Sequence, residues 1–235
     1  MRNFLTKLMN VSNITNEQKY KEVFAMNRKE EIIYATLELA SKSGMKGVSM
    51  SQIADKVGIK APSLYNHFKS KDDIIREMYG FLRQQAQNNS KQNTSDYAKV
   101  FEKKSLEEIL MGSLSTYMGI VSDKYMLQFF KVLYSERSTS KTAATIMVEE
   151  TERMIEKSRD LFYALAVHGK IKNENVDTAA MTYALTIHSL IDYRMDRITA
   201  GQETTFGDGK SPVPQKMIEF IRWFSKQTGI QEKPN

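Results

Sequence analysis

Residues 57–71 read Val-Gly-Ile-Lys-Ala-Pro-Ser-Leu-Tyr-Asn-His-Phe-Lys-Ser-Lys, and this stretch is the most informative about the fold. Gly58 follows a short helical pattern and can take the positive φ angle that a tight turn between two helices requires. Pro62 suits the first turn of a new helix, because the amide hydrogen that proline lacks is not needed there. Leu64 and Phe68 lie four residues apart, so they share one face of that helix and can anchor it to a core.

The other side chains of this short helix are left on its outward faces. Ser63, Tyr65, Asn66 and His67 all carry hydrogen-bonding groups. A short helix that follows a glycine turn and presents such groups has the layout of the recognition helix in a helix-turn-helix domain. We therefore expect the function of the chain to centre on this helix.

Residues 27–82 resemble the DNA-binding domain of the tetracycline-repressor-like (TetR) transcriptional regulators. The resemblance is carried by Ile33, Ala35, Leu39, Gly44, Val48-Ser49-Met50-Ser51-Gln52-Ile53-Ala54, Val57-Gly58-Ile59, Ser63-Leu64-Tyr65-Asn66-His67-Phe68 and Ser70-Lys71. The run Leu-Tyr-x-His-Phe-x-x-Lys, at this distance from Ile-Ala and Gly, is a specific signal. The resemblance covers about a quarter of the chain, and the remainder is similar to the family only in length and helical character.

Composition agrees with a helical protein that has an anionic partner. The 235 residues include only 4 prolines and 11 glycines, and their hydrophobic fraction of 41% can support a buried core. The net charge of +6 favours an anionic partner, and residues 1–75 carry four of the six excess charges. The chain has no cysteine, which excludes disulfides and thiolate metal sites and suits a reducing compartment.

No apolar run approaches the roughly 20 residues that span a bilayer. Residues 1–10 include two basic residues but no apolar stretch of signal-peptide length. We therefore expect a cytoplasmic protein that does not bind membranes.

The periodicity predicts helices throughout the chain. The expected ranges are 28–43, 50–57, 62–68, 71–88, 105–121, 123–133, 141–168, 176–198 and 213–226, with loops at 87–96 and 199–211. The fold class is therefore all-α, with a three-helix helix-turn-helix DNA-binding head and a larger helical effector-binding and dimerisation body. We place the head at residues 26–72 and the body at residues 73–235.

Residues 1–25 form a separate N-terminal segment with three possible interpretations. It is a flexible arm, or an arm whose Arg2 and Lys7 follow a DNA backbone, or a stretch that precedes the natural start of the domain at Met26. The sequence does not separate these alternatives.

Ten residues are the candidates for DNA contact: Ser49, Ser51, Lys60, Ala61, Pro62, Ser63, Tyr65, Asn66, His67 and Lys71. Small residues at the start of the recognition helix can lie beside base edges in the major groove, and Lys60 suits a guanine or a phosphate. The resemblance implies phosphate contacts for Tyr65, His67 and Lys71 and a groove-facing position for Ser51. Ser49 would offer its hydroxyl and nearby helix amides to a phosphate, and Asn66 suits an adenine edge or a phosphate equally.

The resemblance also implies a pocket for a small-molecule effector in the body. Methionine and aromatic side chains suit a largely apolar ligand, although at helical spacing they are most often core. The candidates are Tyr117, Met118, Phe129, Phe130, Met154, Phe162, His188 and Asp192. His188 and Asp192 share a helical face and would pair with each other or, less readily, bind a metal. We expect neither a metal nor a cofactor.

The resemblance places a homodimer interface on the last two predicted helices. The candidate apolar residues are Tyr183, Ala184, Ile187, Leu190, Ile191, Met217, Ile218, Phe220, Ile221 and Phe224. Some of these must pack against the body of their own chain, and the sequence does not divide the two groups.

These features predict a DNA-binding transcriptional regulator, specifically a ligand-responsive repressor that binds a palindromic double-stranded operator as a homodimer. One alternative is a non-specific or architectural DNA-binding protein without an effector, and another is a regulator that senses a partner protein. We do not expect an enzyme, because the chain lacks a glycine-rich phosphate loop, a nucleophile elbow and recognisable paired catalytic carboxylates.

Overall fold

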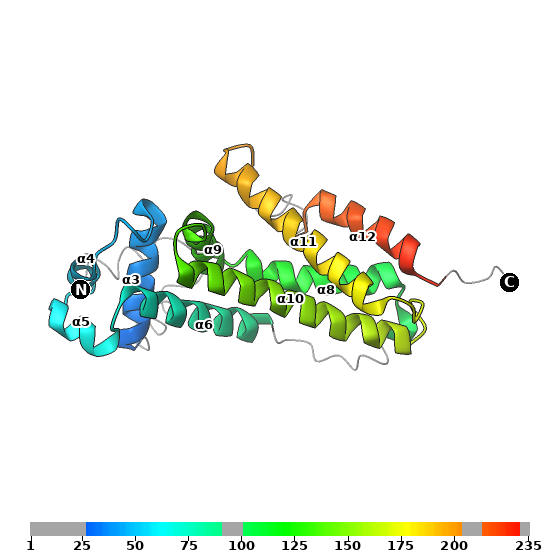
Figure 1. Ribbon diagram of the computed structural model, residues 1–235, viewed down its shortest axis with the longest axis horizontal. Helices are drawn as coiled ribbons and strands as arrows, with labels where there is room; N and C mark the ends of the chain where they lie inside the picture. The colour runs from blue at the N-terminus through cyan, green and yellow to red at the C-terminus, as the bar shows by residue number, and fades with distance from the viewer. Residues whose placement is uncertain (1–26, 91–100, 204–212, 231–235) are drawn as a thin grey trace, which may run out of the picture. The chain divides into compact units, whose positions relative to one another are not determined.

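The computed structural model describes residues 27–90, 101–203 and 213–230, and Figure 1 shows their arrangement into helices. The helices are α3 (Arg28–Ser43), α4 (Met50–Val57), α5 (Ala61–His67), α6 (Lys71–Ser90), α8 (Leu106–Val121), α9 (Lys124–Glu136), α10 (Lys141–Val167), α11 (Val176–Thr199) and α12 (Gln215–Thr228). Within these ranges the only β contact is an isolated bridge between Ile171 and Gly229. The predicted all-α fold class is therefore confirmed.

Local capping explains where several helices begin. Asn27 caps α3, Ser49 caps α4 and Ser105 caps α8, and each forms a reciprocal capping box with the residue three positions later. The predicted range 28–43 is confirmed for α3, and the predicted range 50–57 is confirmed for α4. Helix α12 begins at Gln215 rather than at the predicted residue 213, because Pro214 takes the extended N-cap conformation.

The described chain divides into two compact units. The first contains residues 27–82 and 128–146, and the second contains the remaining described residues from 83 to 230. Helices α6, α9 and α10 each contribute residues to both units. This division does not test the functional boundary at residues 72 and 73, and residues 1–25 lie outside the described residues.

The core of the first unit is formed by α3 and the helices that follow it. Ile32, Ile53 and Leu64 have no exposed surface, and they come from α3, α4 and α5 respectively. The ring of Tyr79 stacks on that of Phe129 with centroids 6.1 Å apart. Because α5 contributes to this shared core, its orientation relative to α4 is determined by packing.

The core of the second unit contains a cluster of aromatic rings from α10, α11 and α12. Phe162 lies 5.4 Å from Tyr183 and 5.8 Å from Phe224, measured between ring centroids. Tyr183 lies 5.7 Å from Phe224. The labels in Figure 1 show α12 running beside α11, and these contacts bury one face of each helix.

Helices long and apolar enough to cross a membrane are absent from the three described ranges.

Candidate functional site

The turn between α4 and α5 has the backbone conformation that the sequence predicts. Gly58 is left-handed, with φ 72° and ψ 34°. Its N–H donates to the carbonyl of Asp55 at 3.2 Å, and the N–H of Ile59 donates to the carbonyl of Ala54 at 3.0 Å. A side chain at residue 58 would meet no neighbour, so the positive φ is the reason for glycine here.

Helix α5 is anchored by two apolar side chains. Leu64 is fully buried and Phe68, which follows the helix, is 2% exposed. Lys60 is the N-cap residue, so α5 begins at Ala61, one residue earlier than predicted, with Pro62 in its first turn. This anchoring leaves the opposite side of the helix free for contact with another molecule.

The candidate DNA-contact residues of α5 lie on that free side. Pro62, Ser63, Asn66 and His67 are exposed, and Tyr65 is 46% exposed. Lys60 is also exposed, whereas Ala61 is half-buried. The structure therefore brings small, polar and aromatic groups together on one short helix, as a groove-binding element requires.

Two further candidates lie at the start of α4. Ser49 and Ser51 are both exposed. The hydroxyl oxygen of Ser49 accepts from the N–H of Gln52 at 3.2 Å, and the N–H of Ser49 donates to Oε1 of Gln52 at 2.7 Å. The Ser49 oxygen therefore caps α4, and the hydroxyl hydrogen is what this side chain can offer to a phosphate.

Lys71 has a role in the fold that sequence analysis missed. Its half-buried ammonium donates to the carbonyl of Met45 at 2.7 Å and to that of Val48 at 2.8 Å. These bonds tie the start of α6 to the loop between α3 and α4. The sequence carries no signal of this, since the partners lie more than twenty residues earlier in the chain. The predicted phosphate contact of Lys71 stays a prediction.

Replacing Lys71 with methionine is expected to lower the free energy of unfolding by about 1–3 kcal/mol, because two carbonyls of buried residues lose a charged donor. Denaturant unfolding measures this change. Lys60→Met is the control, since Lys60 is exposed and its side chain makes no capping bond. Equal stability of the Lys71→Met and Lys60→Met variants would contradict a structural role for Lys71.

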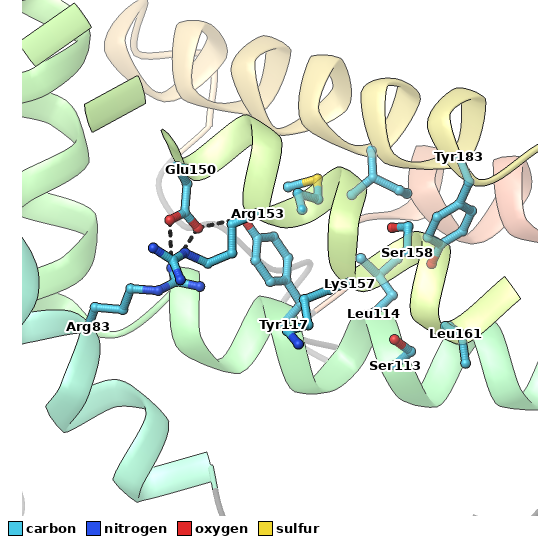
Figure 2. A pocket seen from close by; sticks show the side chains of 12 residues that line it. Arg83, Ser113, Leu114, Tyr117, Glu150, Arg153, Lys157, Ser158, Leu161 and Tyr183 are labelled. Carbon is cyan, nitrogen blue, oxygen red and sulfur yellow. Dashed lines mark hydrogen bonds and ion pairs between the residues drawn. The ribbon is translucent and has the colours of Figure 1, made fainter. Parts of the chain in front are cut away.

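A cavity of about 110 Å³ lies within the second unit. It is lined by Arg83 from α6, by Ser113, Leu114 and Tyr117 from α8, by Glu150, Arg153, Met154, Lys157, Ser158 and Leu161 from α10, and by Tyr183 and Ile187 from α11. Figure 2 shows Arg83, Glu150 and Arg153 at one end and Leu161 and Tyr183 at the other. The cavity is therefore charged at one end, whereas the other end combines apolar side chains with the hydroxyl groups of Ser113, Ser158 and Tyr183.

A buried ion pair occupies the charged end. Nη1 of Arg83 lies 2.7 Å from Oε1 and 2.6 Å from Oε2 of Glu150, whose side chain is 4% exposed (Figure 2). The hydroxyl of Tyr117 donates to the same carboxylate at 3.4 Å. The Nε atoms of Arg83 and Arg153 are buried and have no hydrogen-bond partner among the described residues. Among the described residues, this end of the cavity thus has buried hydrogen-bond donors that lack an acceptor.

At the other end, Tyr183 supplies a neutral hydroxyl. Burial raises the pKa of this hydroxyl well above its ordinary value. The group therefore stays protonated at neutral pH and cannot act as a counter-ion for the arginines.

Two of the eight predicted effector residues, Tyr117 and Met154, line this cavity. Met118, Phe129, Phe130 and Phe162 are buried core residues outside its lining, and Phe129 and Phe130 belong to the first unit. Nε2 of His188 lies 3.5 Å from Oδ1 of Asp192, so these two residues form a pair outside the lining.

Among the described residues there is no group of three His, Cys, Asp or Glu side chains suited to a metal ion. An effector role for each of the eight residues stays a prediction.

Sequence analysis missed the charged residues of the cavity. Glu150, Arg153, Lys157 and Leu161 recur at intervals of three or four, so they share one face of α10 with Met154. That spacing is a signal in the sequence, but charged residues at helical spacing usually indicate a face exposed to solvent. Arg83, on α6, has no such signal.

Helices α4 and α5 are joined by a left-handed glycine, and α5 is anchored on one side and polar on the other. This arrangement defines a helix-turn-helix domain, which is joined here to further helices. Residues 32–78 match the family model described as "Bacterial regulatory proteins, tetR family". The helix-turn-helix part of the chain is therefore similar to the TetR family of bacterial regulators.

Curated relatives match the same part of the chain. The HTH-type transcriptional repressor KstR2 of Mycolicibacterium smegmatis is 35% identical over 52 residues, which are 22% of this chain and 25% of that protein. The class C tetracycline repressor protein of Escherichia coli is 39% identical over 48 residues, 20% of this chain and 22% of that protein. The match thus spans about a quarter of each relative.

Solved structures share the fold over most of the chain. A crystal structure described as a TetR-family regulator from Mesorhizobium loti has a TM-score of 0.63 at 18% identity, covering 87% of this chain and 100% of that chain. A TetR-family regulator from Pseudomonas syringae has a TM-score of 0.60 at 19% identity, with 88% and 100% coverage. At this identity the likeness concerns the fold alone.

Proposed function

We propose that this protein is a transcriptional repressor that binds a palindromic operator as a homodimer and releases it when a small-molecule effector binds. The observation that carries this proposal is helix α5, held by Leu64 and Phe68 while its polar residues face outward. The relatives in Mycolicibacterium smegmatis and Escherichia coli, both named as repressors, support the same function.

The residues of α5 divide into two proposed roles. Ala61, Pro62 and Ser63, at the N-terminal end, lie beside base edges in the major groove and read the sequence. Tyr65 and His67 donate hydrogen bonds to phosphates, which positions the helix without selecting bases. One short helix offers few base contacts, so a two-fold pair of heads on a palindrome supplies the specificity.

A homodimer would use the exposed apolar residues of α11 and α12. Met181, Leu185 and Trp223 are 45%, 41% and 57% exposed, although all three are large and apolar. Seven of the ten interface candidates are buried in their own chain, as expected for part of the set: Tyr183, Ala184, Ile187, Ile191, Met217, Ile221 and Phe224. Exposed apolar residues on two neighbouring helices suit a four-helix interface with a second copy.

The proposed response to effector is a shift between two populations. Helix α6 begins at Lys71, three residues after Phe68, and continues without interruption to the cavity residue Arg83. A ligand in the cavity that favours one position of α6 would change the spacing of the two recognition helices. The affinity for DNA then falls, at most by the ratio of the effector's affinities for the two positions of α6.

Operator binding is expected to weaken steeply as salt rises, because each neutralised phosphate releases condensed counter-ions. Fluorescence anisotropy between 50 and 200 mM salt measures this, with an expected loss of about 10³-fold or more if six or more phosphates are contacted. Tyr65→Ala is expected to weaken all DNA sequences alike, whereas Ser63→Ala is expected to change the preference between sequences. Salt-independent affinity would contradict the proposal.

The rival function is non-specific or architectural DNA binding without an effector. Footprinting on the DNA around the gene distinguishes the two. A protected palindrome supports a repressor, and uniform protection supports the rival. The match of residues 32–78 to a family of regulatory proteins supports the expectation that the chain is not an enzyme.

A further inference from the structure

We infer that the effector is an amphipathic organic anion, whose carboxylate or phosphate group accepts hydrogen bonds from Arg83 and Arg153. Its apolar part would lie against Met154, Leu161 and Ile187 in the same cavity. The inference rests on the proposed function, because it assumes that the second unit holds an effector.

Among the described residues that line the polar end of the cavity, positive charges outnumber negative ones. Arg83 and Arg153 each carry one positive charge, and Glu150 supplies one negative charge. Glu150 is bonded to Arg83 through both carboxylate oxygens. Because a charge near the protein interior is costly without a partner, a second anion at this position would be stabilising. Lys157 adds positive charge at the cavity, although it also lies 3.3 Å from Asp160 on the surface.

The charged end of the cavity also contains buried hydrogen-bond donors that lack an acceptor among the described residues. A guanidinium presents its Nε–H and one Nη–H as a planar fork that fits the two oxygens of a carboxylate or phosphate. In both Arg83 and Arg153 the Nε atom is buried and lacks an acceptor among the described residues. A neutral hydroxyl could accept one of these bonds, but it would leave the excess positive charge in place. An anion satisfies both requirements.

The remaining lining of the cavity indicates that the rest of the ligand is apolar. Leu114, Met154, Leu161 and Ile187 offer apolar surface from three helices. Burial of an alkyl chain against these residues favours binding, because it removes apolar surface from water. With a cavity volume of about 110 Å³, this part of the ligand is narrow and short in the present conformation.

This chemistry also gives the ligand a means of acting on α6. Arg83 is the cavity residue that α6 contributes, and Glu150 on α10 is its partner. An anion that binds Arg83 competes with Glu150 for the same guanidinium. The ligand therefore has different contacts in the two positions of α6, which a population shift requires.

Isothermal titration calorimetry on the full-length protein with four probes of equal chain length tests the inference. Octanoate and octyl phosphate carry the anionic groups, octanol is neutral and octylamine is cationic. We expect at least one of the two anions to bind at least tenfold more tightly than octanol, and octylamine not to bind. Octanoate binding alone would assign a carboxylate ligand, and octyl phosphate binding alone would assign a phosphate ligand.

Arg153→Met removes the guanidinium whose buried Nε lacks an acceptor among the described residues, and is expected to weaken binding of the preferred anion by tenfold or more. Arg153→Gln, which keeps a polar side chain, should show the same loss. Arg159→Met is the matched control, because Arg159 is an exposed residue on the same helix, paired with Asp177 at 2.8 Å outside the cavity. It should bind like the unmodified protein.

Equal affinity for octanol and the anions, or unchanged anion affinity in both Arg153 variants, would overturn the inference. DNA footprinting on the same preparation separates this failure from failure of the proposed function. A protected palindrome without anion binding would overturn the anionic ligand and leave the repressor proposal standing. Anion binding lost in the Arg153 variants, without any protected operator, would support the ligand chemistry and overturn the repressor proposal.

Discussion

Glu150→Leu is expected to lower the free energy of unfolding by about 3–5 kcal/mol, because it leaves a buried charge without its partner. Glu150 is 3% exposed, and its carboxylate accepts two close contacts from Arg83 and one hydrogen bond from Tyr117. Leucine fills similar space but cannot accept a hydrogen bond. The guanidinium of Arg83, 14% exposed, would then stay near the interior without a counter-ion.

Chemical denaturation of the full-length protein measures the loss. The double variant Arg83→Met with Glu150→Leu should recover most of the stability, because it removes both charges instead of leaving one unpaired. Glu149→Leu, at the preceding, less buried residue of α10, is the control and should have a much smaller effect. If the single and double variants were equally unstable, the loss would come from packing and not from the ion pair.

Leu185→Glu combined with Trp223→Glu is expected to convert the proposed homodimer into monomers and to lower affinity for the proposed operator by about 10²–10⁴-fold. Both side chains are large, apolar and more than two-fifths exposed, so a charge there costs the single chain little. At a two-fold interface the same charges would be buried opposite apolar surface and opposite each other. A monomer binds only one half of a palindrome and loses the gain from joining two heads.

Sedimentation velocity gives the oligomeric state, and anisotropy with a full operator and a single half-site gives the affinities. The affinity for the half-site should change little. Val167→Glu is the control, because Val167 is 83% exposed at the end of α10 and lies on neither α11 nor α12. A double variant that remained dimeric would place the interface elsewhere on the molecule.

Elements governed by near neighbours in the chain were predicted well. The bounds of α3 and α4 agree with prediction, because their caps are formed by residues three positions apart. The left-handed conformation of Gly58 is predicted for a similar reason, since a sharp turn at the end of a helix favours glycine at the position after the last helical residue. The spacing of Leu64 and Phe68 likewise identified the buried side of the recognition helix.

Predictions that depend on distant partners were less complete. The sequence predicts a phosphate contact for Lys71, and the structure adds that its ammonium binds the carbonyls of residues 45 and 48. Arg83 and Glu150 are separated by 67 positions, so no local pattern connects them. The apolar periodicity of α11 also did not distinguish Tyr183, which is buried, from Leu185, which is 41% exposed.

The helices, the glycine turn and the outward residues of α5 are therefore predictable from the sequence, because backbone capping and helical spacing act over three or four positions. Which apolar residues of α11 and α12 stay exposed, and which charged residues meet in a cavity, depends on tertiary packing. Helical spacing shows which residues share a face, but the helix that covers that face depends on how the chain folds back on itself.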